Sequence, residues 1–103
     1  MNSKQKGKRG ELELAKILRD FGFDARRGVQ YKGGSDSPDV VGIKGLHIEC
    51  KRVEKLNVYD AIEQSERDAG DEIPCVMWRR NGKRWLVIQY LDDFLKEKQY
   101  DHD

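Results

Sequence analysis

The chain has 103 residues, the length of one domain, and 38% of them are charged against 37% that are hydrophobic. This composition excludes a membrane-spanning protein, because no run approaches the ~18 apolar residues that a bilayer requires. The opening MNSKQKGKRG has no apolar stretch typical of a secretion signal. We therefore expect one cytoplasmic domain over 1–103, with frayed ends at 1–6 and 99–103. Cys50 and Cys75 are expected to be free thiols.

The net charge of +1 is distributed unevenly along the chain. Residues 1–32 contain nine Lys and Arg against four acids, whereas residues 92–103 contain five acids and two lysines. A basic front half is suited to phosphate contacts. An unevenly charged, solvated surface is the plainer interpretation, so charge alone permits nucleic-acid binding without establishing it.

The first predicted element is an amphipathic helix over 8–21, because four apolar residues follow the i, i+3, i+4, i+7 spacing. These residues are Leu14, Ile17, Leu18 and Phe21. Gly22 is expected to end the helix, and a short strand over 23–27 follows. Residues 28–37 carry three glycines and two serines, which predicts an irregular loop.

The later elements alternate between strands and helices. They are strands over 39–43 and 46–51, a helix over 57–69, strands over 74–78 and 84–89, and a helix over 91–98. Lys44-Gly45 and Asn81-Gly82 indicate hairpin turns, and Asn57 is expected to cap the second helix. The order αβββαββα predicts an α/β domain with one twisted sheet and helices on its faces.

The strand over 46–51 carries the side chains best suited to chemistry. Because side chains alternate along a strand, an apolar set should face the core and a polar set the other side. The apolar set is Leu46, Ile48 and Cys50, and the polar set is His47, Glu49 and Lys51. Glu49 and Lys51 thus point the same way, and Asp39 in the preceding strand can approach Glu49 across the hairpin.

Two converging carboxylates repel each other unless a cation lies between them. Oxygen ligands with few histidines or thiolates nearby favour Mg²⁺, with Mn²⁺ as a substitute. Such an ion polarises a phosphate oxygen, and a neighbouring Lys can orient water or help to deprotonate it. These parts suffice for phosphodiester hydrolysis, although cross-strand ion pairs on an exposed strand face are the structural alternative.

Several further residues remain ambiguous from spacing. Glu11 and Glu13 lie on opposite shoulders of the first helix's apolar stripe, and an acid there also complements the helix dipole. His47 is expected to support the site or to lie on the surface rather than to bind a metal. Trp78 and Trp85 are expected to pack in the core or at a dimer interface rather than to stack on bases.

Taken in order, these motifs resemble the archaeal-type Holliday junction resolvases and their phage relatives, within the PD-(D/E)xK nuclease superfamily. The matching features are Lys6-Gly7 followed by Glu11, the phrase Leu18–Phe23, the loop Gly33-Gly34-Ser35, Pro38-Asp39, Glu49-Cys50-Lys51, and a helix that bears Gln64. The resemblance covers residues 6–95. The short gap between Asp39 and Glu49 departs from the family and demands a tight hairpin, and the acidic tail has no counterpart role there.

The resemblance implies a restriction-endonuclease-like core with a central mixed sheet flanked by helices. The implied metal ligands are Asp39, Glu49, the Cys50 backbone carbonyl and Glu11. Lys51 is expected to position the attacking water, Gln64 to orient Lys51 or the water, and Ser35 to contact the scissile phosphate. A surface amide and a loop hydroxyl remain open alternatives for the last two. The expected phosphate contacts are Lys8, Arg9, Arg26, Arg27, Lys32 and Arg52.

The activity implied is that of a Mg²⁺-dependent, homodimeric endonuclease that nicks four-way junctions in pairs, leaving 5′-phosphates. A related nuclease acting on flaps, nicks or single strands is one alternative. A non-catalytic DNA-binding protein with the same fold is another, although the presence of Asp39, Glu49 and Lys51 together argues against it. We expect neither a membrane partner nor a small-molecule cofactor.

Overall fold

The chain follows the predicted order αβββαββα, and the computed structural model describes residues 3–28 and 37–100. The elements are α1 (Ser3–Asp20), β1 (Arg26–Arg27), β2 (Val40–Val41), β3 (Leu46–Lys51), α2 (Val58–Ala69), β4 (Ile73–Trp78), β5 (Leu86–Ile88) and α3 (Leu91–Tyr100). Among the described residues, no helix is both long enough and apolar enough to cross a membrane. Both cysteines are free thiols, as predicted.

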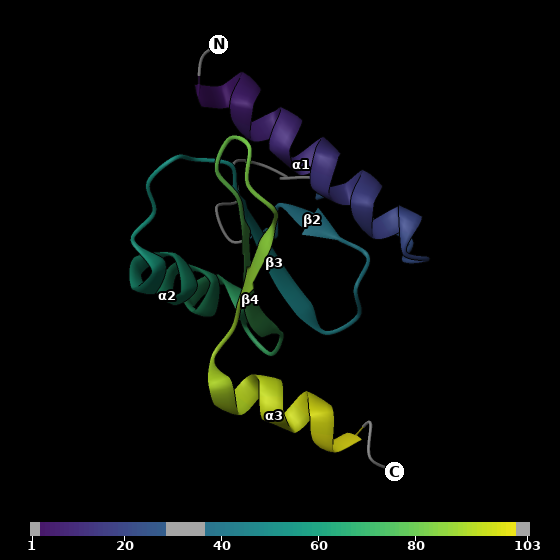
Figure 1. Ribbon diagram of the computed structural model, residues 1–103. Coiled ribbons are helices and arrows are strands. Elements are labelled where there is room, and N and C mark those ends of the chain that lie inside the picture. Colours follow the sequence, from purple (N-terminus) through teal and green to yellow (C-terminus); the bar gives the residue numbers. More distant parts are fainter. Residues whose placement is uncertain (1–2, 29–36, 101–103) are drawn as a thin grey trace.

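One mixed sheet runs through the domain in the order β1-β2-β3-β4-β5. β3 and β4 are parallel and are joined through α2, whereas the other neighbours are antiparallel. α1 lies across one face of the sheet and α2 across the other (Figure 1). Alternation along β4 divides the core accordingly, since Cys75 and Met77 belong to the α1 cluster and Val76 and Trp78 to the α2 cluster. The predicted α/β class is confirmed.

α1 begins at Ser3, earlier than the predicted start at residue 8, so it includes residues that were expected to be frayed. Lys6, in its first turns, lies 3.6 Å from a carboxylate oxygen of Glu54. At Gly10 the helix packs closely on the end of β3, because an added Cβ would lie 2.6 Å from the Cβ of Arg52. This close approach brings Glu11, the next residue, towards the sheet.

The predicted hairpin of β2 and β3 is confirmed, with Val40 opposite Ile48. The same antiparallel register places Asp39, the residue before Val40, opposite Glu49, and the Asp39 amide donates to the Ile48 carbonyl at 2.9 Å. β2 is shorter than predicted, because Gly42 adopts a φ of +126° and ends the strand.

α2 has the predicted cap, since the Asn57 side chain accepts a hydrogen bond from the Asp60 amide at 3.0 Å. Ser65 joins α2 to two strands: its hydroxyl donates to the His47 carbonyl at 3.0 Å and accepts from the Cys75 amide at 3.1 Å. The polar face of β3 is therefore covered by α2, whereas the sequence placed only the apolar face in the core. Parallel strands joined through a helix are covered on both sides, which explains the difference.

Candidate functional site

Asp39 and Glu49 face each other across the β2–β3 hairpin. Their side chains share a hydrogen bond, and burial together with the neighbouring Asp39 carboxylate raises the pKa of Glu49 to about 8. The other contact of Asp39 is with the backbone, since its Oδ2 accepts from the Cys50 amide at 2.8 Å. The pair therefore holds a proton at neutral pH, in a place where a divalent cation can take over the balancing of charge.

Glu11 reaches the same place from α1. Its Oε1 accepts from Arg27 Nε at 2.9 Å, and Glu11, Arg27, Gly28 and Asp39 line a pocket of about 190 Å³. Burial raises the pKa of Glu11, and the Asp39 charge adds to that rise, against the lowering effect of Arg27. Asp39 thus lies between two acids, with Glu49 across the hairpin and Glu11 in this pocket, and carboxylate oxygens of this kind are ligands that suit a hard divalent cation.

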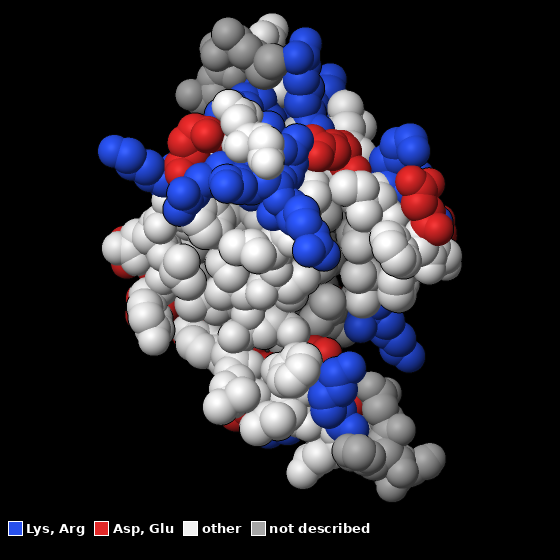
Figure 2. Space-filling view, viewed as in Figure 1, with Lys and Arg blue, Asp and Glu red and all other residues white. Residues whose placement is uncertain are grey.

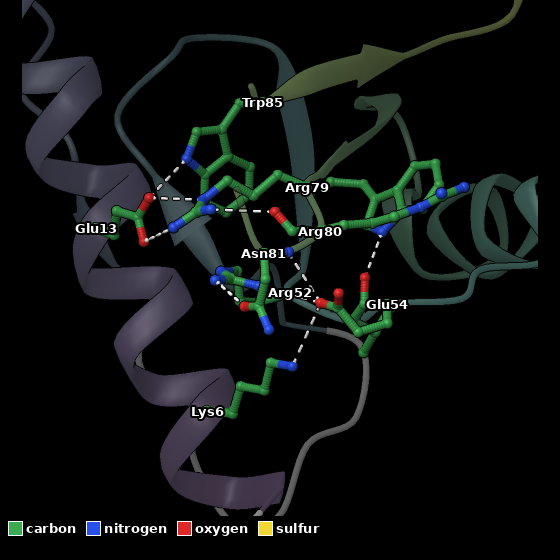
Figure 3. A network of polar contacts seen from close by, with 10 residues as sticks. Lys6, Glu13, Arg52, Glu54, Arg79, Arg80, Asn81 and Trp85 are labelled. Carbon is green, nitrogen blue, oxygen red and sulfur yellow. Dashed lines mark hydrogen bonds and ion pairs between the residues drawn. The ribbon is translucent and has the colours of Figure 1, made fainter. Parts of the chain in front are cut away.

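Glu13, the other shoulder of the helix, has a different set of partners. Its carboxylate accepts from Arg79 at 2.8 and 3.0 Å and from Trp85 Nε1 at 3.1 Å (Figure 3). The hydrogen bonds from Arg79 lower the pKa of Glu13. Glu13 therefore ties α1 to the end of β4, while Glu11 turns towards Asp39.

Lys51 and Gln64 are brought together from β3 and α2. The Lys51 ammonium donates to Gln64 Oε1 at 3.2 Å. Lys51 lies two residues after Glu49 in one strand, so both side chains emerge on the α2 face of the sheet. The amide is thus placed to hold the ammonium next to the carboxylate pair.

His47 is buried rather than on the surface, with 1% of its area exposed. Its Nε2 lies 3.0 Å from Glu49 Oε1, and its Nδ1 lies 3.7 Å from Glu72 Oε1. Potential ligand atoms of His47, Glu49 and Asp68 all lie within 4.8 Å of one another. Sequence reasoning missed Asp68, although its i+4 spacing from Gln64 places both on one side of α2 and could have indicated it.

The basic residues expected to contact phosphate divide into two groups. Lys8, Arg9 and Arg26 are exposed. Arg27 is paired with Glu11, and Arg52 donates to Asn81 Oδ1 at 2.6 Å with only 13% of its side chain exposed. Lys32 and Ser35 lie outside the described residues, and the Cys50 carbonyl ligand stays a prediction.

Lys and Arg side chains gather over the amino-terminal part of α1 and the turn between β4 and β5 (Figure 2). A broad area without charged side chains lies next to them in the same view. The tryptophans are packed as predicted: Trp78 is in the α2 cluster and Trp85 lies against the α1 cluster. Base stacking on either ring would have to use an exposed edge.

Comparison with known proteins identifies the family. The family profile described as archaeal Holliday junction resolvase (Hjc) matches residues 2–102. The structure is similar to that of Hjc from Archaeoglobus fulgidus, a Holliday junction resolvase, with a TM-score of 0.60 and 30% identity over 79% of this chain and 73% of that one. No curated protein matches. The chain therefore belongs to the archaeal Holliday junction resolvase family of nucleases.

Proposed function

We propose that this chain is a divalent-metal-dependent endonuclease that resolves four-way DNA junctions by paired nicks, with Mg²⁺ as the preferred ion and Mn²⁺ as a substitute. One observation carries the proposal: two hydrogen-bonded carboxyl groups, Asp39 and Glu49, lie beside an ammonium that is held in place, Lys51. Family membership supports the choice of branched DNA as the substrate.

The ligands proposed for the ion are Glu11, Asp39 and Glu49, with the Cys50 carbonyl as a further oxygen. When bound, the ion supplies a Lewis acid that polarises the phosphate and stabilises the developing charge. The Cys50 amide fixes the Asp39 carboxylate through its 2.8 Å hydrogen bond. Lys51, held by Gln64, orients the attacking water and balances negative charge at the phosphorus.

The exposed cations near this site are proposed to hold the DNA backbone. Lys8 and Arg9 lie on α1 and Arg26 on β1, close along the chain to Glu11 and Arg27 respectively. Contacts of this kind fix the position of the DNA without reading its sequence. Lys32 and Ser35 remain proposed phosphate contacts from the sequence alone.

A second copy of the chain is proposed to cover the exposed apolar side chains of β5 and α3. β5 is an edge strand of the sheet, and Val87, Leu91 and Leu95 are 61%, 72% and 50% exposed. Val87, Gln89, Leu91 and Phe94 also line a hollow of about 320 Å³. A two-fold dimer presents two equivalent sites, which suits a junction with two-fold symmetry and paired cuts.

The test is incubation of the pure protein with a synthetic four-way junction, a flap, a nicked duplex and a linear duplex, each with Mg²⁺ or Mn²⁺. We expect symmetric nicks with 5′-phosphates in the junction only. Survival of all substrates refutes the enzyme proposal, and cleavage confined to flaps or nicks assigns another nuclease activity. An Asp39→Asn variant that behaves like the wild type in binding and in cleavage also contradicts the proposal.

A further inference from the structure

A second hollow, of about 490 Å³, opens at the turn between β4 and β5. Its lining residues are Trp78, Arg79, Arg80, Gly82, Lys83, Arg84 and Leu86. Its volume is in the ~300–1,000 Å³ range of small-molecule sites. The proposed metal ligands and phosphate contacts do not line it, so the function described above leaves it unused.

The hollow has an apolar floor that is held in place by neighbouring residues. Trp78 and Leu86 are opposite each other in the β4–β5 pair, so their side chains share one face. The Trp78 indole donates to the Val53 carbonyl at 2.8 Å, which holds the ring, and the Arg80 guanidinium lies 5.2 Å from its centroid. Leu86 is 53% exposed. Because Trp78 is only 8% exposed and Arg80 lies over its ring, a planar nucleobase would contact the exposed edge of the indole, Leu86 and the guanidinium.

The rim of the hollow offers positive charge that is not already used. Lys83 and Arg84 are exposed, and within the described part of the chain neither side chain has a hydrogen bond or an ion pair. Arg79 differs, because Glu13 holds its guanidinium. Two free cations next to an apolar floor complement a nucleotide, with its base inside and its phosphates at the rim.

The turn that carries these residues is held in place by its neighbours. The Asn81 amide donates to Glu54 Oε2 at 2.9 Å, and Arg52 donates to the Asn81 side chain at 2.6 Å (Figure 3). Arg52 directly follows Lys51 in the chain, so the same short segment supports both the turn and the proposed nuclease site. The hollow is therefore formed before any ligand binds.

The hollow lies on the same side of the sheet as the proposed nuclease site. Trp78 is paired with Lys51 in the parallel β3–β4 register, and the Arg79 amide donates to the Lys51 carbonyl at 3.2 Å. Neighbouring strands are ~4.8 Å apart, so the floor lies roughly 5–10 Å from Lys51. Successive nucleotides of one DNA strand are ~3.4 Å apart along the helix axis. The distance from Lys51 to the hollow therefore corresponds to a few nucleotides.

We propose that this hollow binds one unpaired nucleotide of the branched DNA, a few positions from the scissile phosphate, with its base against Trp78 and Leu86 and its phosphates on Lys83 and Arg84. The proposal rests on the proposed nuclease function. Bases at a branch point are readily unstacked, whereas a base in continuous duplex must first leave its stack at a free-energy cost. The hollow thus favours branched over linear DNA.

The phosphate contacts are tested with the double variant Lys83→Ala/Arg84→Ala, using Lys44→Ala/Arg67→Ala as the matched control. The control removes the same two residue types near the opposite end of β3 and β4, where the Ile73 amide donates to the Gly45 carbonyl. Junction affinity is measured without divalent metal over a range of salt. We expect the salt slope to fall by about one for each phosphate that the first variant no longer neutralises, and to stay unchanged in the control. Equal slopes in both variants overturn the proposal.

The base contact is tested with junctions that carry one abasic nucleotide, moved position by position on both sides of the cut. At one position the wild type should lose roughly tenfold in affinity. Arg80→Ala/Leu86→Ala should weaken binding of the intact junction and show no further loss at that position, since the two changes remove the same interaction. If each abasic position lowers the junction affinity of the wild type and of the variant by the same factor, no base occupies the hollow.

Failure of this inference can be told apart from failure of the proposed function. A wild type that neither cuts nor binds the intact junction removes both. A wild type that cuts the junction with Mg²⁺, while both hollow variants behave like their controls, removes the nucleotide site alone. Thermal unfolding of each variant confirms that exposed side chains were removed without loss of fold.

Discussion

Gln64 on α2 accepts a 3.2 Å hydrogen bond from the ammonium of Lys51 on β3. The amide thereby restrains a flexible side chain beside the carboxylate pair. We expect Gln64→Leu to lower the single-turnover rate by roughly 10- to 100-fold, because a small misplacement of a reacting group is costly. Junction affinity should be nearly unchanged. Glu63→Leu, on the exposed side of the same helix, is the control and should retain the wild-type rate.

Asp39→Asn should separate binding from cleavage. The amide keeps the shape of the side chain and can still accept from the Cys50 amide, but it loses the charge that the cation requires. We expect cleavage to fall by roughly two orders of magnitude or more while junction binding stays within about twofold. Gel-shift and cleavage assays on one protein sample provide the comparison. A parallel loss of binding would show that Asp39 supports the DNA surface instead.

Glu11→Gln and Glu13→Gln should have opposite effects. Glu11 lies in the small pocket with Asp39, so its substitution should reduce cleavage and affect stability little. Glu13 holds Arg79 and Trp85, so its substitution should lower the free energy of unfolding by about 1–3 kcal/mol. Denaturant unfolding and cleavage rates measure the two effects. If only the Glu13 variant loses activity, the metal ligand on α1 is Glu13 and not Glu11.

Stability of the metal-free protein should depend on the protonation of Glu49. Its pKa rises from 4.5 to about 8 on folding, so between these values the folded state binds one more proton than the unfolded chain. The stabilisation is fully present below the lower value and is lost as the pH rises through the upper one. Each ~1 kcal/mol of lost stability lowers the Tm of such a domain by about 4–8 °C.

The measurement is Tm against pH in a chelator. Glu49→Gln should flatten the decline between about pH 4.5 and 8, and Mg²⁺ should restore Tm most strongly at about pH 8 and above because the ion replaces the proton. An unchanged pH dependence in Glu49→Gln would locate the titrating group elsewhere.

Leu91→Glu should dissociate the proposed dimer. Leu91 is 72% exposed in the single chain, so a charge there costs little in folding but opposes burial against a second copy. Sedimentation should change from dimer to monomer, and paired cutting of one junction should become independent nicking. Leu12→Glu, at a 49% exposed position on α1, is the control. Monomeric wild-type protein that still cuts in pairs would exclude this interface.

The hairpin and the charged strand could be predicted from the sequence because both rest on local alternation. Asp39 and Glu49 meet as the spacing indicates, and Asn57 caps α2 as expected. The choice between Glu11 and Glu13 depends on partners distant in sequence, since Arg79 is 66 positions from Glu13. Helical periodicity holds no information about such a partner, so only the resemblance selected Glu11.

The burial of His47 was not predictable for a related reason. Its environment is created by α2, whose position over β3 follows from the crossover to β4 and not from any pattern within Leu46–Lys51. The same crossover brings Asp68 close to Glu49. Strand alternation predicts the face of the sheet to which each side chain points. Which element packs on that face depends on the tertiary structure.

The β2–β3 pairing makes the segment Asp39–Glu49 intolerant of changes in length. A shift of one residue in an antiparallel pair turns every side chain of a strand to the opposite face. Because β4 holds β3 in register over six residue pairs, one residue inserted or deleted between Gly42 and Gly45 would shift β2 instead and turn the Asp39 carboxylate away from Glu49. A change of length in this turn should therefore cost more activity than a substitution of the exposed Lys44, whereas Gly42 should stay glycine because an added Cβ would collide with the Cα of Ala25.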